Sequence, residues 1–474
     1  MGKRKPFLTV IVSDSRDVWI ETMTYNGNHF WRRIRNLGSF VALGLALALG
    51  LAIGACAQQP SAAELPAGPN PSQIQPYHLP PAKLAQAIAL GRIRPLIHFG
   101  AELWNVGALW LLLATGSATR LVQWLAAKTR LRWLESALFS GLLAAFVFLA
   151  VDLPVGAIGH FFSLRYGISV ETWPLWLLDQ SKTLGLTLLV EIPLLMLAFY
   201  LMQWNWSRRR YWFWFAAAIV PLLLLFTFLL PPLIEPIFFD FEPLSQSHAA
   251  LAQQLERVVA RTGTSIPPER MFLMKASEKS NGLNAYVSGL GASRRIVVWD
   301  TTADRMPTDQ ILFTFAHETG HYVLHHIAKG LTLAAFGTFA LLWAVSRLAE
   351  WLTRRFGKGW RVETVAALPG LTVLLLAFAL LQIATEPVES ATSRHFEHEA
   401  DVFGQEAIHG LVPDPQKTTV AAFDSLGEAY LDDPNPNPFV EFWSYDHPST
   451  QSRAIFAAHY NPWVAGQKPR FFSK

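Results

Sequence analysis

Residues Thr308–His326 read TDQILFTFAHETGHYVLHH, and this stretch decides both the fold and the chemistry that the sequence predicts. The preceding residues, Asp304–Pro307, are of the kind that open helices, so we expect one helix along the whole stretch. A four-residue step on a helix puts His317 and His321 on one face, one turn apart. Two imidazoles in that arrangement suit one zinc ion.

Glu318 lies about 100° around the helix from His317, so it need not bind the metal and can take a proton from a metal-bound water. A chance match on a helix with ordinary histidines is the alternative. His325 is the next histidine four residues on. Eight residues of helix would put it about 12 Å from His317 along the axis, which is too far to share one zinc ion.

The third protein ligand must therefore come from another part of the chain. The polar helix after the last apolar run offers Glu386, Glu389, His395, Glu397, His398, Glu399 and Asp401. Glu397 and Asp401 are four residues apart beside a stripe that we expect to be buried. This stripe consists of Phe396, Ala400, Phe403 and Ala407. Such a carboxylate pair can supply one ligand and one group that orients a ligand imidazole. A solvated acidic face is the alternative.

Further motifs occur in the same order as in one known family. HETGH is followed by SRHFEHEAD (393–401) and by Asp446-His447-Pro448 with Arg453. It is preceded by IEP (234–236), FEPL (241–244), NAY (284–286) and VWDT (298–301). From about residue 75 to 460, the sequence resembles the integral-membrane type I CAAX prenyl protease family, the a-factor-converting gluzincins. Several spaced motifs agree in kind and in order, so the resemblance is specific.

The resemblance implies a ligand set and a base. It makes His317, His321 and Glu397 the ligands of one zinc ion per chain and Glu318 the general base. It assigns Asp401 as a supporting carboxylate. The chemistry agrees, because a zinc-activated water and a neighbouring base are what peptide-bond hydrolysis requires.

The resemblance also implies an oxyanion site and a substrate strand. It puts His447 and Arg453 near the reaction centre as stabilisers of the tetrahedral oxyanion. It assigns Asn284, Ala285 and Tyr286 to the strand along which substrate lies, where an exposed edge would hold an extended peptide through main-chain hydrogen bonds. A purely structural Asp-His-Pro turn and an ordinary hairpin are the alternatives.

The composition predicts a membrane protein. Of 474 residues, 51% are hydrophobic and 16% are charged, against roughly 25% charged in an average soluble domain. This much apolar surface excludes a disordered or collagenous chain. No basic patch indicates nucleic acid. The single cysteine, Cys56, excludes an internal disulfide.

Six or seven apolar runs approach the length of a spanning helix, about 17 to 25 residues. They are Leu37–Ala55, Phe99–Thr115, Leu138–Ile158, Leu184–Met202, Tyr211–Leu230, Leu331–Val345 and Val365–Ile383. The predicted fold is mainly α: a polytopic helical membrane protein whose zincin-type catalytic domain, helices with a small β-hairpin, is split by two spanning helices.

The expected order along the chain has six segments. They are a signal-like or first spanning segment (1–56), a connector with an approach helix at Ala82–Arg92 (57–98), membrane helices (99–239), a catalytic region with HExxH (240–329), two membrane helices (330–385) and a catalytic region with the third ligand (386–474). In the catalytic regions we expect helices at Ala249–Arg261, Glu389–His409 and Thr450–His459, and a hairpin of Asn284–Ser288 with Arg295–Trp299.

Three ionisable residues lie inside the apolar runs. Glu102, Asp152 and Glu191 would be costly facing lipid, so we expect them to face the bundle interior or a water-filled chamber, which the resembled family encloses. Structural pairing between helices is the alternative. We assign none of them a catalytic role.

The N-terminus differs from the eukaryotic pattern. Arg32, Arg33 and Arg35 precede an Ala/Leu-rich run that ends in small residues before Cys56, as in a bacterial lipoprotein signal. Met23 is then an alternative start. A plain first spanning helix is the other interpretation. Both indicate a bacterial inner-membrane protein, in which a prenylated substrate is not expected.

Positive charges beside the short loops predict which side the active site faces. The clusters are Arg32, Arg33 and Arg35; Arg120, Lys128, Arg130 and Arg132; Arg208, Arg209 and Arg210; and Arg354, Arg355, Lys358 and Arg361. If each run spans once, all of them lie on the cytoplasmic face and the active site faces the periplasm. The eukaryotic relatives direct the corresponding domain to the cytosol, so the two indications conflict.

The sequence thus predicts a membrane-embedded zinc metalloendopeptidase that acts on a peptide or membrane-protein substrate in the lipid bilayer. The competing hypothesis is a non-enzymatic transporter or scaffold with a structural zinc site. Glu318 favours the enzyme, because a scaffold has no use for a base beside the metal.

Overall fold

The computed structural model describes residues 77–204, 210–228, 231–289, 294–464, 466 and 468–472, and the structural statements below concern these residues. The predictions about the run Leu37–Ala55, about Cys56 and about Met23 lie outside them. So do the arginines before that run and residues 57–76 of the connector.

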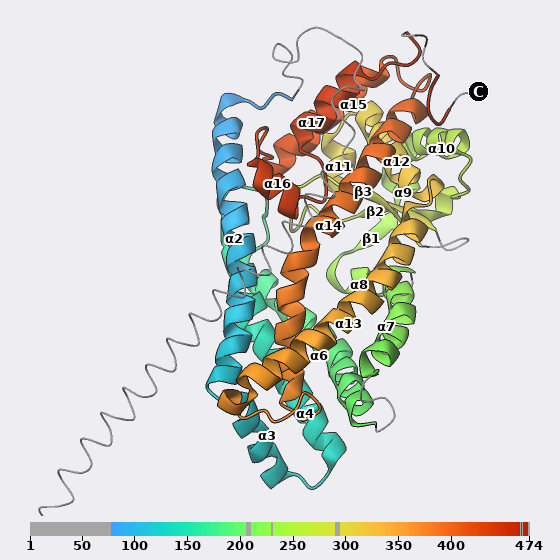
Figure 1. Ribbon diagram of the computed structural model, residues 1–474. Helices are drawn as coiled ribbons and strands as arrows, with labels where there is room; N and C mark the ends of the chain where they lie inside the picture. Colours follow the sequence, from blue (N-terminus) through green and yellow to red (C-terminus); the bar gives the residue numbers. More distant parts are fainter. Residues whose placement is uncertain are drawn as a thin grey trace, which may run out of the picture. The chain divides into compact units, whose positions relative to one another are not determined.

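Six helices in the described part are long and apolar enough to cross a membrane. They are α2 (Pro81–Ala114), the continuous α4 (Arg132–Val147), η3 (Phe148–Asp152) and α5 (Leu153–Arg165), then α6 (Trp173–Gln203), α7 (Tyr211–Phe228), α13 (His326–Trp360) and α14 (Gly370–Ala407). Each contains all or most of one of the predicted apolar runs; the run Val365–Ile383 was predicted to begin too early, because the chain is still in a turn before α14 begins at Gly370. The predicted helical membrane fold is confirmed (Figure 1).

Two of these helices extend far beyond the predicted apolar runs. The approach helix Ala82–Arg92 is the first part of α2, which continues through Pro95. The helix predicted from Glu389 is the second half of α14, which continues through Pro387. A change from apolar to polar side chains does not interrupt the backbone hydrogen bonds, so a helix can pass from lipid into a water-exposed region without a break.

The helix that carries HETGH ends earlier than predicted. α12 spans Thr308–Val323, and the chain turns at His325, whose φ is 59°. A new helix, α13, then begins at His326. The prediction of one helix through His326 is therefore wrong at its end, because a left-handed residue stops the α-helical ladder. The turn puts His326 beside the last turn of α12, which matters for the site below.

The sheet has four strands in the order β1-β2-β4-β3. They are β1 (Phe241–Pro243), β2 (Met271–Met274), β3 (Ala285–Ser288) and β4 (Arg295–Trp299). The predicted hairpin is confirmed, since β3 pairs antiparallel with β4. The two other strands were not predicted. β2 pairs parallel with β4 and antiparallel with the three-residue β1, which is too short to show an alternating pattern.

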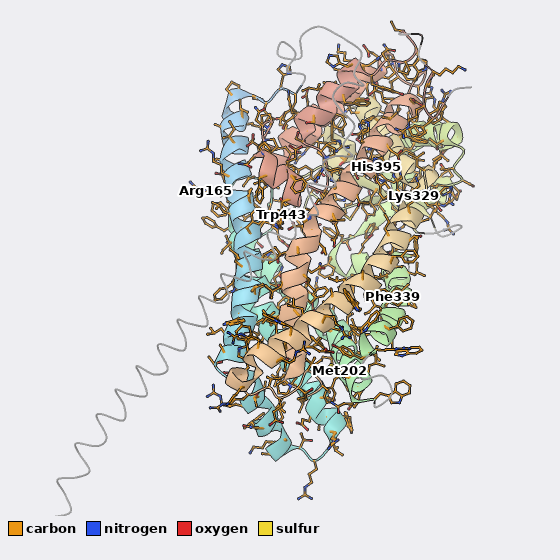
Figure 2. The ribbon with its side chains drawn as sticks, viewed as in Figure 1. Arg165, Met202, Lys329, Phe339, His395 and Trp443 are labelled. Atoms are coloured by element: carbon orange, nitrogen blue, oxygen red, sulfur yellow. The ribbon has the colours of Figure 1, made fainter. Side chains whose placement is uncertain are left out.

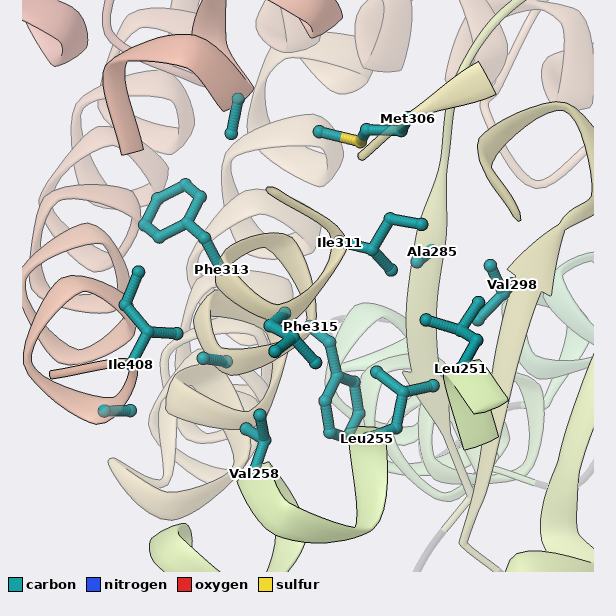
Figure 3. Close-up of a cluster of buried hydrophobic side chains, with 14 of the residues drawn as sticks. Leu251, Leu255, Val258, Ala285, Val298, Met306, Ile311, Phe313, Phe315 and Ile408 are labelled. Atoms are coloured by element: carbon teal, nitrogen blue, oxygen red, sulfur yellow. The ribbon is translucent and has the colours of Figure 1, made fainter. Parts of the chain in front are cut away.

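One buried hydrophobic cluster joins the sheet to α12 and α14 (Figure 3). Leu255 of α10 (Ala249–Thr262), Ile311 and Phe315 of α12, and Ile408 after α14 are each at most 1% exposed. Burying side chains of this size stabilises the fold by about 1.5–3 kcal/mol each. The cluster therefore holds α12 against both the sheet and the end of α14.

The remaining elements surround these. They are α3 (Ser117–Lys128), α8 (Pro231–Phe238), α9 (Leu244–Ser247), α10 (Ala249–Thr262), η4 (Pro268–Arg270), α11 (Asp300–Arg305), α15 (Pro415–Tyr430), α16 (Pro438–Ser444) and α17 (Thr450–His459). The predicted α10 and α17 are confirmed. The sheet, α10, α12, α15 and α17 gather at one end of the spanning helices, and α3 lies at the other (Figure 1). Figure 2 shows His395 of α14 toward the first end and Met202 of α6 toward the second.

Candidate active site

Three side chains from two helices converge on one point. His317 and His321 lie on α12, and Glu397 lies on α14. Nε2 of His317 is 3.2 Å from Oε2 of Glu397, and Nε2 of His321 is 3.3 Å from Oε1. In the described part of the chain, these residues form the one cluster of three or more possible metal ligands whose donor atoms lie within 4.8 Å of one another. Two imidazole nitrogens and a carboxylate oxygen are a donor set that suits catalytic zinc.

The other candidates for the third ligand have different surroundings. Glu386 pairs with His98 at 2.7 Å, Glu389 accepts a hydrogen bond from Thr385, His395 is exposed, and His398 packs on Phe456. Glu397 and Asp401, which we expected beside the buried stripe, are themselves buried, with exposed fractions of 7% and 4%. The acidic pair of this helix is therefore not a solvated face.

Close packing of α12 on α14 brings the three candidate ligands together. Gly404 leaves no room for a side chain, because a Cβ there would lie 3.0 Å from the backbone nitrogen of His317. Gly320 faces Phe403 in the same way, with a Cβ position 2.9 Å from the ring. Two glycines, one on each helix, thus permit the approach that puts Glu397 beside both histidines.

Asp401 lies against His317, and Arg453 holds Asp401 in place. Nδ1 of His317 lies 2.9 Å from Oδ1 of Asp401. Arg453 of α17 donates to both oxygens of that carboxylate, from Nε at 2.9 Å and from Nη2 at 2.7 Å. A proton on Nδ1 facing the carboxylate leaves the lone pair of His317 on Nε2, which is the atom that faces Glu397.

Burial disfavours the proton on His317, but Asp401 and Glu397 outweigh it and raise the pKa of the imidazole to about 10. A metal bound at this site would therefore have to displace a proton.

Glu318 lines the pocket beside His321, whose volume is about 440 Å³. Burial raises the pKa of its carboxyl, and the nearby His317 and His321 oppose that shift. A more basic carboxylate is suited to accept a proton near neutral pH.

We call His317, His321 and Glu397 the ligand cluster. His447 lies beside this cluster, in the pocket that adjoins it. Its Nδ1 is hydrogen bonded to Oδ1 of Asp446 at 2.8 Å, and its Nε2 lies 3.1 Å from Oε2 of Glu397. Burial lowers the pKa of His447, but Asp446 and Glu397 outweigh that effect and raise it to about 9. The imidazole therefore carries a positive charge at neutral pH. It also lines the same pocket as Glu318.

The predicted substrate strand, β3, lies at the edge of the sheet. Asn284 precedes it and is exposed, while Ala285 is buried. Tyr286 donates a hydrogen bond to Oε2 of Glu235 at 2.8 Å. The residue of β3 that lines the pocket beside Glu318 is Val287, which the sequence did not single out.

Two of the other family motifs support the sheet. Glu235, from IEP in α8, binds Tyr286 and also lies 2.5 Å from Nη2 of Arg295 in β4. Asp300, from VWDT, accepts hydrogen bonds from the backbone nitrogens of Ala276 and Ser277 after β2. Glu235 therefore holds β3 and β4, and Asp300 holds the segment after β2; neither belongs to the cluster of His317, His321 and Glu397.

The three ionisable residues of the apolar runs lie in spanning helices, away from the ligand cluster. Glu102 in α2 interacts electrostatically with His98 and Glu386, and Asp152 in η3 interacts with Glu191 in α6. Glu102 and Glu191 are half-buried, and Asp152 is exposed. Glu102 is attracted to His98 of the same helix and repelled by Glu386, and the like-charged Asp152 and Glu191 repel each other, so these interactions are not ion pairs between helices. That they face a water-filled chamber stays a prediction.

Sequence reasoning missed the partners of His321. Nδ1 of His321 is hydrogen bonded to Nδ1 of His326 at 3.2 Å, and Nε2 of His326 to Oε2 of Glu399 at 3.1 Å. Glu399 was only one of seven candidates for the third ligand. The run HETGHYVLHH showed that His326 is near, but its contact depends on the turn at His325, which no residue type in the run indicates.

Two family models match the chain in succession. One is described as CAAX prenyl protease N-terminal, five membrane helices, and it matches residues 70–240. The other is peptidase family M48, and it matches residues 245–460. The chain belongs to peptidase family M48. It is a membrane-embedded metalloendopeptidase of the CAAX prenyl protease type, and no finding supports the non-enzymatic alternative.

Curated relatives agree with this. An uncharacterized metalloprotease, YhfN, of Bacillus subtilis is 29% identical over 79% of this chain and 85% of its own length. CAAX prenyl protease 1 of Saccharomyces cerevisiae is 28% identical over 67% of this chain and 71% of its own length. The crystal structure of S. mikatae Ste24p has the same fold, with a TM-score of 0.68 at 20% identity, covering 89% of this chain and 98% of that chain.

Proposed function

We propose that this M48 peptidase binds one zinc ion per chain through His317, His321 and Glu397. The observation that carries this proposal is the convergence of the two helix-borne imidazoles and the carboxylate, with Glu318 and His447 lining the pocket beside them. Zinc bound there supplies a Lewis acid for the scissile carbonyl and lowers the pKa of water.

The protein's own groups then have separate tasks. Glu318 takes the proton from the attacking water and delivers it to the leaving amine. His447, which is cationic at neutral pH, donates to the oxyanion that forms on the scissile carbonyl. Asp401 orients His317, and Arg453 holds Asp401 through two hydrogen bonds.

The substrate class follows from the edge strand and the pocket. An extended peptide would add to β3 through main-chain hydrogen bonds, with Asn284, Ala285 and Tyr286 leading to the pocket. Val287, Ile327 and Phe396 make part of the pocket apolar. The names of several relatives specify prenylated CAAX proteins, and we propose the broader class of extended, apolar peptide segments in membrane proteins.

We also propose a division of the chain and a location. Residues 240–329 and 386–474 form one catalytic unit, interrupted by the spanning parts of α13 and α14. The basic residues of α3, of the turn before α4 and of the end of α13 lie at the end of the spanning helices away from the sheet, which supports a catalytic unit on the opposite, periplasmic side of a bacterial inner membrane.

The metal assignment is tested by elemental analysis of purified variants. Wild-type protein should contain one zinc per chain, and His317→Ala and Glu397→Ala should contain far less. Glu318→Gln should keep its zinc and lose peptidase activity by about 10²-fold or more, because removing the base leaves the ligands intact. Full zinc in Glu397→Ala would contradict the third-ligand assignment. Wild-type cleavage by Glu318→Gln would contradict the base.

A comparison of membrane proteomes would identify the substrate class. Membranes from cells that express wild-type protein are compared with membranes from cells that express Glu318→Gln. Proteins shortened only with the active enzyme should share an apolar segment at the cut. Cleavage confined to polar, soluble proteins would contradict the proposed class.

A further inference from the structure

Each histidine of the ligand cluster contacts its own series of side-chain partners. His317 is backed by Asp401 and Arg453, as described above. His321 is backed by His326 and Glu399, and Oε1 of Glu399 accepts a hydrogen bond from Nη2 of Arg470 at 2.5 Å. Both series of side-chain partners end in an arginine that lies outside α12 and α14. We propose that His326, Glu399 and Arg470 are positioning residues that fix the tautomer and orientation of His321 as a metal ligand.

The hydrogen bonds allow one arrangement of protons that suits metal binding. An ionised carboxylate only accepts, so Nε2 of His326 carries the proton that faces Glu399. Nδ1 of the neutral His326 then has a lone pair, and it accepts from Nδ1–H of His321. The lone pair of His321 is left on Nε2, and Nε2 is the atom that faces Glu397. The hydrogen bonds with His326 and Glu399 therefore require the same tautomer of His321 that metal binding through Nε2 requires.

The surroundings of His326 restrict its movement. Its side chain is 2% exposed, and its ring stacks on Phe396 of α14 with centroids 4.6 Å apart and planes 12° apart. The left-handed turn at His325 brings it back toward α12. His395 also approaches Glu399, at 4.0 Å, but it is exposed and too distant for a hydrogen bond. His326 is therefore the partner that Glu399 can hold in place.

Glu406 anchors the segment that supplies Arg470. This fully buried carboxylate of α14 accepts from the backbone nitrogens of Arg470, Phe471 and Phe472 at 2.6, 2.7 and 3.0 Å. It also accepts from the hydroxyl of Tyr460. The segment 468–472 is thus attached to the helix that carries Glu397, and its arginine has a defined position.

The inference rests on the proposed role of His321 as a ligand, and its test uses metal affinity as well as activity. The zinc affinity of each variant is measured by competition with a chelator, and the Co²⁺-substituted proteins are compared by absorption spectroscopy. His326→Leu should bind zinc about 10- to 100-fold more weakly and show an altered Co²⁺ spectrum. His326→Gln should recover part of the loss, because an amide can accept from His321 and donate to Glu399.

Arg470→Gln provides a second, milder variant. It should weaken zinc binding, but less than His326→Leu does. In the His326→Leu background it should cause no further loss of zinc affinity, since the two residues act through the same series of contacts. Lys468→Gln is the matched control, because Lys468 is an exposed residue of the same segment. It should bind zinc as wild type does.

Two outcomes would overturn the inference. One is wild-type zinc affinity and an unchanged Co²⁺ spectrum in His326→Leu. The other is an effect of Arg470→Gln on the melting temperature of the metal-free protein with no effect on zinc affinity, which would mean a merely structural role. Failure of the ligand assignment looks different, because full zinc binding by His321→Ala would remove the basis of the inference itself.

Discussion

Arg453 and His447 both approach Oε2 of Glu397, at 3.8 and 3.1 Å, but their contacts differ. The guanidinium of Arg453 is buried, and two of its N–H groups are taken by Asp401. The imidazole of His447 is half-exposed in the pocket that Glu318 lines. The two residues were expected to share one role as oxyanion stabilisers. The contacts favour His447 for that role and a positioning role for Arg453.

Substitution of Arg453 separates the two roles. If Arg453 positions Asp401, Arg453→Lys should weaken zinc binding by about tenfold or more, because lysine keeps the charge but loses the two-pronged contact. Chelator competition measures the affinity, and Arg257→Lys, at an exposed position of α10, is the control. Unchanged zinc affinity together with a large fall in kcat would instead favour the oxyanion role.

His447→Gln should keep wild-type zinc content and lower kcat/KM by about 10²- to 10³-fold, as expected when an oxyanion donor is removed. The raised pKa of His447 means that its proton is present at neutral pH and is lost as pH rises through about 9. Wild-type activity should therefore fall on the alkaline side, and the profile of His447→Gln should lack that fall. A variant with the same alkaline fall as wild type would assign it to another group.

At the scale of elements, the site depends on how closely α12 and α14 pack. The periodicity of apolar residues and the HExxH spacing were enough to predict α12. They also narrowed the candidates for the third ligand to the carboxylate pair of Glu397 and Asp401 on the later helix. They did not predict that α14 runs unbroken from Gly370 to Ala407, nor that Gly404 lies against the backbone of His317. Contacts between helices some 80 residues apart leave no periodic signal in either helix.

Gly404→Ala tests this packing. The added Cβ would lie 3.0 Å from the nitrogen and 3.2 Å from Cα of His317, and backbone atoms of a buried helix cannot yield as a side chain does. We expect a loss of about 1–3 kcal/mol in the free energy of unfolding, together with weaker zinc binding. Gly337→Ala in α13, where nothing lies within 4 Å of the Cβ position, is the control. Equal stability and zinc affinity in the two variants would show that the close approach is not required.

For the whole molecule, composition alone indicated a membrane protein, and all or most of six predicted apolar runs lie in the described spanning helices. The parallel pairing of β2 with β4 and the partners of His321 could not be predicted in the same way. Both depend on residues distant in sequence whose individual types, such as Met271 or Arg470, are ordinary for their positions. The seventh run, Leu37–Ala55, lies outside the described residues.

The direction of the spanning helices bears on which side the active site faces. α2 begins near α15, where Tyr77 donates to the backbone oxygen of Asp432, and it ends beside α3 at the other end of the bundle. Each later spanning helix reverses direction, so the turn of Arg130 and that of Arg361 lie at the same end. From the positive-inside rule we therefore predict that this end lies in the cytoplasm and that His317, His321 and Glu397 lie on the opposite side of the membrane.

Reporter fusions test this orientation directly. Alkaline phosphatase fused after Lys474 should be active, and a fluorescent protein at the same site should be dark, because phosphatase matures outside the cytoplasm and the fluorescent protein matures inside it. The same reporters inserted after Thr129, in the turn between α3 and α4, should give the opposite pair of signals and serve as the internal control. A fluorescent, phosphatase-negative fusion after Lys474 would place the site in the cytoplasm. The basic turns would then lie on the outer face, against the charge rule, and the orientation would match that expected from the eukaryotic relatives.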